Sequence, residues 1–209
     1  MKSQIINKIV DEEWEMFQKT QNVGGRASCQ DNKPTFYTMR VSQFTFWNDE
    51  CIESYLCDVE EAAKSGDNLV TYKYGYMMKA TDPIGYEDIK DRLPEISEEK
   101  STLVERLVEQ TLSWCDEFNK KYPNIAKSGR PVRTGEEIGS FASIETYCRG
   151  EVSTYSKETL KKLVKMYEDY AKTGFNLQEH VVALEAGLES ADQLQRLEES
   201  ISQRFQPLP

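Results

Sequence analysis

A hydrophobic period of about 3.6 residues runs through most of the 209-residue chain, and it restricts the fold more than any other feature. In the segment 97–119, Leu103, Leu107 and Val108 lie on one stripe and Glu105 lies opposite. Such a stripe is typical of an amphipathic helix that packs on a core. Only the segment 69–76 has an ambiguous pattern, and no other segment shows the alternation of a β-strand. The sequence therefore predicts a single all-α domain.

Helix start and stop signals predict about eight or nine helices in this domain. The main helices are expected at about 3–20, 34–47, 49–64, 69–80, 97–122, 143–153, 157–173, 177–188 and 191–205, with a short helical segment at 86–92. Asn176 and Ser190 are expected to cap the last two helices, and the stretch 123–142 is expected to be irregular. Residues 1–175 are predicted to form the main domain, and residues 176–209 a C-terminal helical hairpin packed on it as an appendage.

Composition narrows the classes of partner and chemistry. The net charge of −10 argues against nucleic acid or an anionic membrane surface as the main partner. The single histidine, His180, excludes sites that need two, such as His-rich zinc sites and di-iron bundles; we expect it to be a packing or surface residue. Five cysteines without Cys-x-x-Cys spacing are expected to be reduced thiols in a cytoplasmic protein. No signal peptide or membrane-spanning segment is expected.

Four predicted helices carry a polar side chain in the middle of their apolar face. Projection at about 100° per residue places Glu13, Arg40 with Gln43, Lys73 and Glu151 among apolar neighbours. Burial of an isolated charge costs several kcal/mol unless the charge is paired. Because there are two charges of each sign, we expect them to neutralise one another around a shared centre. One interpretation is a polar pocket; the other is a buried ion network that only determines helix packing.

The loop 24–33 is expected to close this centre, because it links the Glu13 and Arg40 helices. Two glycines allow close backbone approach, and Arg26 could bind a carboxylate. Cys29 precedes a helix N terminus and could be a nucleophile, although a small buried cysteine is the favoured interpretation. Gln30 belongs to the same loop, and Asp31 could pair with Arg40 or cap the next helix.

Aromatic and basic side chains could complete the wall of the pocket. Tyr76 belongs to a tyrosine-rich segment that is mostly core but could turn hydroxyls inward. Tyr147 shares a helix with Glu151, and Arg149 is expected to pair with Glu145 at i,i+4 spacing. Arg133 lies in a Gly/Pro-framed loop and is either a pocket residue or an ordinary surface arginine.

No metal and no cofactor are expected. Glu13, Asp31 and Glu151 could bind Mg²⁺ through oxygen. However, Arg40 and Lys73 would already neutralise these carboxylates. The sequence also lacks the glycine-rich motifs of nucleotide-binding loops.

Several of these segments resemble one protein family. The matching segments are Glu13-Trp14-Glu15-Met16-Phe17, Gly24-Gly25-Arg26-Ala27-Ser28-Cys29-Gln30-Asp31, Met39-Arg40-x-Ser42-Gln43-Phe44, Tyr76-Met77-Met78-Lys79 and Glu145-Thr146-Tyr147-x-Arg149-Gly150-Glu151. Over about residues 1–175 the chain resembles the bacterial family of unknown function DUF4125. The resemblance implies a bacterial source and, in some members, a link to a nucleotidyltransferase-like domain; it implies no activity.

Our first hypothesis is an enzyme that acts on a small zwitterionic or carboxylated substrate, such as an amino-acid derivative. Arg40, with Arg26 or Arg133, would bind the carboxylate. Glu13 or Glu151 would act as general acid or base. The reaction class would be that of a lyase or hydrolase without a cofactor.

The residues assigned to this site fall into two groups. The expected catalytic residues are Glu13, Lys73, Tyr76 and Glu151, and the expected substrate-binding residues are Arg26, Cys29, Gln30, Asp31, Arg40, Gln43, Arg133, Tyr147 and Arg149. Lys73 would be a second acid–base group or a Schiff-base amine, and Tyr76 or Tyr147 could supply a proton.

Two alternatives remain open. The first is a non-catalytic metabolite-binding or accessory module for a partner protein, for which the nucleotidyltransferase-like domain is a candidate; a homodimer is a further option. The second is a purely structural helical domain with a buried ion network. Convergence of the four charges without a cavity would favour the structural network.

Overall fold

A computed structural model describes residues 1–22, 24–136 and 142–204, and all structural statements below refer to these residues. Short polar side chains cap the N termini of many of the helices. The side chains of Asn68, Ser143 and Asn176 each accept a hydrogen bond from the backbone N–H three residues later, which satisfies one of the unpaired donors at a helix start. Ser190 makes no such bond, so that predicted cap is wrong.

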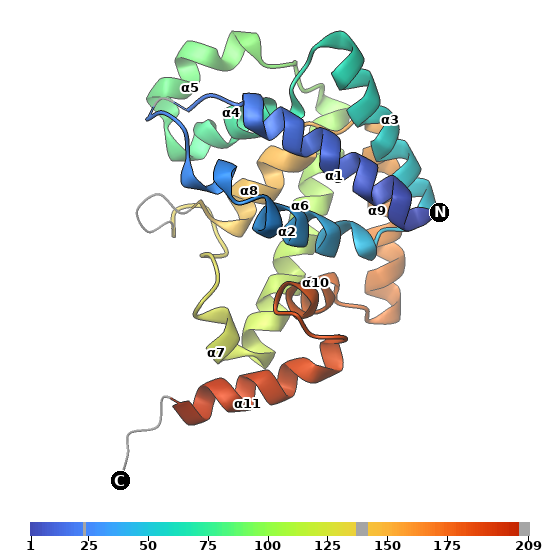
Figure 1. Ribbon diagram of the computed structural model, residues 1–209, viewed down its shortest axis with the longest axis vertical. Coiled ribbons are helices and arrows are strands. Elements are labelled where there is room, and N and C mark those ends of the chain that lie inside the picture. Colours follow the sequence, from blue (N-terminus) through green and yellow to red (C-terminus); the bar gives the residue numbers. More distant parts are fainter. Residues whose placement is uncertain (23, 137–141, 205–209) are drawn as a thin grey trace.

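The described part of the chain is all-helical, with eleven α-helices, three 3₁₀ segments and no strand (Figure 1). The α-helices are α1 (Lys2–Lys19), α2 (Lys33–Thr45), α3 (Asp49–Ser65), α4 (Leu69–Thr81), α5 (Pro83–Ile89), α6 (Glu98–Lys121), α7 (Pro123–Ala126), α8 (Ile144–Val152), α9 (Lys157–Thr173), α10 (Leu177–Glu185) and α11 (Leu194–Arg204). The 3₁₀ segments are η1 (Ser28–Asp31), η2 (Lys90–Arg92) and η3 (Ala191–Gln193). The predicted fold class is confirmed, but the predicted count of eight or nine was too low. One reason is that a helix as short as α7 lies in a stretch expected to be irregular and is too brief to show a hydrophobic period.

The main core lies between α1, α3, α6, α8 and α9. Its fully buried members include Ile9, Ile52, Leu107 and Leu160. Helix α1 packs against α2, α3 and α4, and α6 packs against α8 and α9. Helix α6 runs along the long axis of the molecule and connects this core to α7 (Figure 1).

A second, smaller core lies at the far end of α6. It contains Phe118 and Tyr122 together with Ala183 and Leu194. Helix α10 packs on α2 and α6, whereas α11 packs on α7. The Glu198 carboxylate accepts backbone hydrogen bonds at the start of α7, which binds α11 to it. The predicted boundary at residue 175 stays a prediction.

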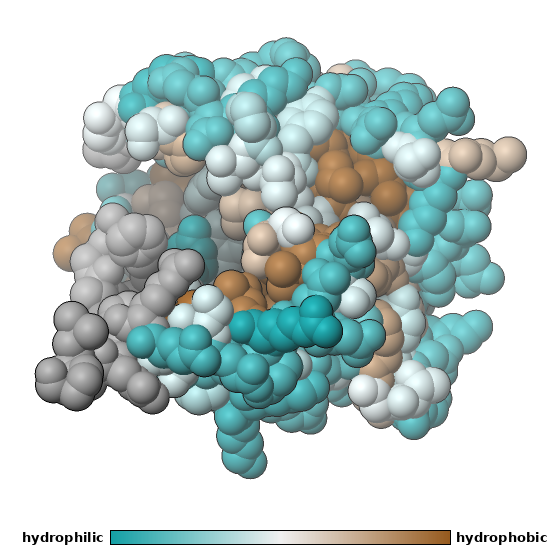
Figure 2. Space-filling model, turned by 60° about the horizontal axis from the view of Figure 1, so that its bottom comes forward, coloured by the Kyte–Doolittle hydropathy of each residue, from teal (hydrophilic) through white to brown (hydrophobic). Residues whose placement is uncertain are grey.

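Hydrophilic side chains cover most of the face shown in Figure 2, with apolar patches between them. This distribution agrees with the amphipathic helices, because their charged sides face outward. The only large hydrophobic side chains that are clearly exposed among the described residues are Met1, Met39 and Ile84.

Gly150 allows α8 to approach α4 closely. A Cβ at this position would lie 2.5 Å from Met77 Cγ and 2.9 Å from the Lys73 carbonyl oxygen. These distances are shorter than real Cβ contacts, and a backbone oxygen cannot turn aside. The absence of a side chain at Gly150 therefore determines how closely these two helices pack.

We predict that Gly150→Ala destabilises the protein by about 1–2 kcal/mol, because overpacking of this contact costs up to about 3 kcal/mol and the gain in helix propensity returns only roughly 1 kcal/mol. Urea unfolding measures the change. Gly24→Ala is the control, since Gly24 has no neighbour within 4 Å of an added Cβ. A Gly150→Ala protein as stable as the wild type would disprove the proposed steric limit.

Candidate functional site

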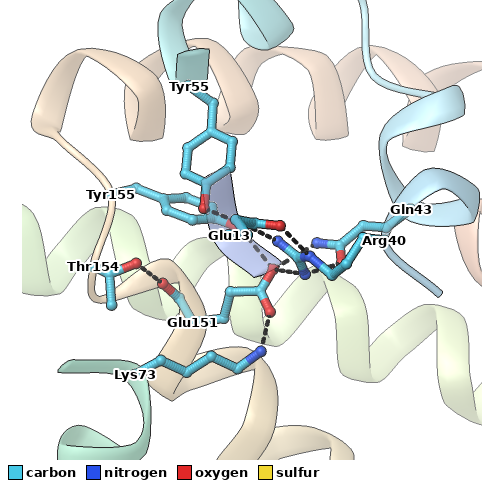
Figure 3. A network of polar contacts seen from close by, with 8 residues as sticks. All are labelled: Glu13, Arg40, Gln43, Tyr55, Lys73, Glu151, Thr154 and Tyr155. Atoms are coloured by element: carbon cyan, nitrogen blue, oxygen red, sulfur yellow. Dashed lines mark hydrogen bonds and ion pairs between the residues drawn. The ribbon is translucent and has the colours of Figure 1, made fainter. Parts of the chain in front are cut away.

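Arg40 bridges two buried carboxylates. Its Nε and Nη2 atoms donate to the two Glu13 carboxylate oxygens at 2.7 and 2.6 Å, and its Nη1 donates to Glu151 Oε1 at 2.8 Å (Figure 3). The planar guanidinium suits this arrangement because its donors point in fixed directions. Helices α1, α2 and α8 are therefore joined through one side chain.

Glu151 also binds α4. Lys73 Nζ donates to its second carboxylate oxygen at 2.5 Å. Gln43 Nε2 donates to Oε1 at 2.8 Å, and Gln43 Oε1 accepts from Arg40 Nη1 at 2.7 Å. The five residues Glu13, Arg40, Gln43, Lys73 and Glu151, called the polar network below, thus lie together in the positions that the helix projection suggested.

Two tyrosines that donate to the polar network were not predicted from the sequence. Tyr55 OH donates to Glu13 Oε1 at 2.6 Å, and Tyr155 OH donates to Glu151 Oε1 at 2.7 Å. The two rings pack with centroids 4.6 Å apart. Tyr55 lies among the buried apolar side chains of α3, and this position was the available signal, because a buried hydroxyl requires a partner. Tyr155 lies in the turn between α8 and α9, outside the predicted helices, so helix projection gave no signal for it.

The four charged side chains of the polar network are buried, and pairing shifts the pKa of Glu151 and of Arg40. Glu13, Arg40, Lys73 and Glu151 are 3–9% exposed, and their formal charges cancel. Burial would raise the pKa of Glu151, but Arg40 and Lys73 together hold it well below its ordinary value. Burial opposes the charge of Arg40, yet Glu13 and Glu151 hold its pKa well above the ordinary value.

The pKa values of Lys73, Tyr55 and Tyr155 are also shifted away from neutral pH. Burial would lower the pKa of Lys73, but Glu151 and Tyr147 raise it. Burial raises the pKa of Tyr55 and Tyr155 far above the ordinary value, and their carboxylate partners add to the shift. None of these five groups is therefore tuned to exchange a proton near neutral pH.

Tyr147 is the exception at the edge of the polar network. Lys73 Nζ lies 3.7 Å from its ring centroid. The Lys73 charge lowers the pKa of Tyr147, although burial opposes this. Of the tyrosines near the polar network, Tyr147 is the one whose pKa is lowered.

The loop 24–33 lies outside the polar network. Gln30 is fully buried, donates to the carbonyls of Phe17 and Thr20 and accepts from Ala27 N–H, so it fastens η1 to the end of α1. The expected pair between Asp31 and Arg40 is wrong, because Asp31 pairs with Arg26 on the surface.

Cys29 is exposed, which corrects the expectation that it is buried.

Three further predicted residues also lie outside the polar network: Arg133, Arg149 and Tyr76. Arg133 pairs with Asp116 at the surface, because its loop lies beside α6. Arg149 forms the predicted pair with Glu145 and a second pair with Glu105.

Tyr76 OH donates to the Pro94 carbonyl at 2.7 Å and makes no hydrogen bond to a residue of the polar network.

His180 stacks on Phe175 with ring centroids 4.0 Å apart, which agrees with a packing role.

The largest cavity that we describe lies beside the polar network. It has a volume of about 650 Å³ and is lined by side chains from α4, the segment 86–96, α6 and α8, among them Tyr76 and Arg149. A smaller cavity of about 280 Å³ lies between α6 and α9. None of the four network charges lines either of these cavities, so neither cavity is the pocket that these charges were expected to surround. Their convergence without a described cavity at their centre favours the structural ion network as the role of these four charges.

Fold and site together define an all-helical domain organised around a buried, charge-neutral ion network. The chain matches the family model described as "Protein of unknown function (DUF4125)" over residues 3–199. The protein belongs to this family. No curated protein and no solved structure matches the chain.

The residues that the structure describes contain neither a membrane-spanning helix nor a metal-binding cluster. No helix among them has the length and apolar character needed to cross a bilayer. The same residues hold no group of three His, Cys, Asp or Glu side chains that could bind a metal ion.

We predict that Lys73→Met destabilises the protein by about 3 kcal/mol, because it removes one cation from a buried pair and leaves its carboxylate partner short of a donor. Lys157→Met is the control. Lys157 pairs with Glu99 at 3.0 Å, but both side chains are about half exposed, so its loss should cost less than about 1 kcal/mol. Equal losses in chemical unfolding would contradict a buried role for the Lys73 pair.

The lowered pKa of Glu151 predicts a pH-dependent stability. A glutamate in the unfolded chain has a pKa of about 4.3, so as pH falls Glu151 takes up its proton in the unfolded chain before it does so in the folded protein. The contribution of Glu151 is complete above about pH 5 and is lost as pH falls toward the folded pKa.

The stability gap between wild type and Glu151→Gln should therefore be largest near neutral pH and shrink in acid. Unfolding at pH 7, 5 and 3.5 measures it. Glu168→Gln is the control, because Glu168 makes only an exposed pair with Arg106. A gap that grows in acid would show that the sign is wrong.

Proposed function

We propose that the protein is a non-catalytic module that binds a small zwitterionic or carboxylated molecule, such as an amino-acid derivative. The observation that carries this proposal is the saturation of the polar network. Each carboxylate oxygen of Glu13 and Glu151 already accepts at least one hydrogen bond from a network side chain. A substrate that used these groups would first have to break buried ion pairs.

The pKa shifts favour binding over acid–base catalysis. A general acid or base works best when its pKa lies near the working pH. Glu151 is held ionised, while Arg40 and Lys73 are held protonated. The polar network therefore suits a scaffold that holds four helices in place.

The cavity beside the polar network has a size and a lining that suit a small charged ligand. Its volume of about 650 Å³ lies within the range of small-molecule sites. Side chains of both signs line it, which suits a ligand that carries both charges. Glu151 and Arg149 are two residues apart on α8, so the polar network also positions one wall of the cavity.

One observation favours an enzyme as a second candidate. Tyr147 has a lowered pKa because Lys73 lies over its ring. A tyrosine whose pKa is lowered by a neighbouring lysine would act as the general base of a cofactor-free lyase or hydrolase. In this candidate Tyr147 would take the role first assigned to Glu13 or Glu151.

The two candidates are separated by measuring binding and turnover on the same compounds. Thermal shift with L-amino acids and with their N-acetyl and amide derivatives should identify a ligand that stabilises the protein. Mass spectrometry after long incubation should recover that ligand unchanged. Turnover that Tyr147→Phe abolishes while binding is kept would overturn the non-catalytic proposal. Arg133→Ala is the control, because Arg133 lies away from the polar network and the cavity.

A further inference from the structure

Two partly exposed aromatic rings, one on α1 and one on α2, face the same cation. Lys33 Nζ lies over both rings, 5.0 Å from the ring centroid of Tyr37 and 5.8 Å from that of Trp14. The carboxylate of Asp11 lies 4.0 Å from the same nitrogen. Ring faces and a carboxylate around one positive charge are typical of a site for an ammonium group. Trp14, Tyr37 and Asp11 are called the aromatic cage below.

The walls of the aromatic cage are held by contacts among themselves and with the core. Trp14 packs edge to face on Phe17 and Phe36, with ring centroids 6.0 and 5.2 Å apart. Tyr37 OH donates to the carboxylate of Asp11, so these two walls hold each other. A site whose walls are set in advance binds at a smaller entropic cost than one that must form.

Lys33 occupies the aromatic cage loosely. Where an ammonium group is in close contact with a ring in this protein, as Lys73 is with Tyr147, the distance from nitrogen to centroid is 3.7 Å. Both distances in the aromatic cage are more than 1 Å longer. An N–C bond is about 1.5 Å long, so a nitrogen that carries methyl groups would touch both rings from the position of Lys33 Nζ.

Displacement of Lys33 requires little rearrangement. Its side chain is about half exposed, so its ammonium group can leave the rings and remain hydrated. The net charge of −10 also attracts cations to the protein as a whole.

We infer that the aromatic cage binds a quaternary ammonium group, which displaces the ammonium group of Lys33. The faces of Trp14 and Tyr37 contact the methyl groups, and Asp11 balances the charge. Choline and the side chain of a trimethylated lysine share this chemistry. The inference goes beyond the proposed function and does not depend on it, because the aromatic cage contains no residue of the polar network or of the cavity lining.

The fluorescence of Trp14 reports directly on binding. The other two tryptophans, Trp47 and Trp114, are only 1% and 3% exposed, whereas Trp14 is partly exposed. The full chain is titrated with choline and with the neutral analogue that has a tert-butyl group in place of trimethylammonium. Choline should bind at least about tenfold more tightly, because only the charged form is attracted to the ring faces. Equal affinities would overturn the inference.

Paired variants locate the site and keep Trp14 as the reporter. Lys33→Ala should tighten choline binding about two- to fivefold, because it removes the competing cation, whereas Lys64→Ala, at an exposed lysine of α3, should not. Tyr37→Leu and Asp11→Asn should each weaken binding about fivefold, and Asp88→Asn, at an exposed aspartate of α5, should leave it unchanged. Equal affinities of Lys33→Ala and Lys64→Ala would contradict displacement.

A second pair of probes identifies the source of the group. The probes are the N-acetyl amides of trimethyllysine and of unmodified lysine. If trimethyllysine binds more tightly than choline, the ligand is the side chain of a partner protein; the reverse order indicates a free small molecule, and both orders support the quaternary ammonium assignment.

Two outcomes would overturn the assignment itself. One is that unmodified lysine binds as tightly as trimethyllysine. The other is that no probe binds either wild type or Lys33→Ala. The proposed binding role of the cavity would stand in both cases, because the cavity lies elsewhere in the fold.

Discussion

The pairing of Arg40 with two buried carboxylates is the interaction on which the arrangement of the helices depends. A buried carboxylate or guanidinium is unstable without a partner, because the interior cannot replace the lost hydration. Glu13 of α1 and Glu151 of α8 therefore require Arg40 of α2, and Glu151 also requires Lys73 of α4. Apolar packing alone tolerates several helix registers, whereas these directional contacts are met in one.

Different side chains of α8 face the polar network and the cavity. Residues two positions apart on a helix point in nearly opposite directions, so Glu151 faces the polar network while Arg149 and Ser153 face the cavity. Gly150 lies between them and lets α4 approach. The groups that hold the helices together are thus separate from those left available to a ligand, and this separation is why saturation of the polar network does not exclude binding.

The sequence predicted the inward-facing charges well and the loop residues poorly, for one physical reason. Helix projection depends only on backbone geometry, so it identifies which side of a helix Glu13, Arg40, Lys73 and Glu151 face. It does not determine where a loop side chain such as Arg26 or Arg133 lies, because loop conformation depends on contacts with other elements. Tyr55 was missed because a single hydropathy value hides a hydroxyl on an aromatic ring, and Tyr155 because it lies in a turn, where helix projection does not apply.

The sequence by itself determined the helical class, most helix starts and the presence of unlike charges on apolar faces, because these follow from local periodicity and capping. Only the tertiary structure decided which charges meet, that their hydrogen bonds are saturated, and that the described cavity lies beside the polar network rather than within it. These properties depend on distances between residues far apart in the chain, such as the 111 positions between Arg40 and Glu151. Local pattern carries no information on those distances, since they result from the packing of whole helices.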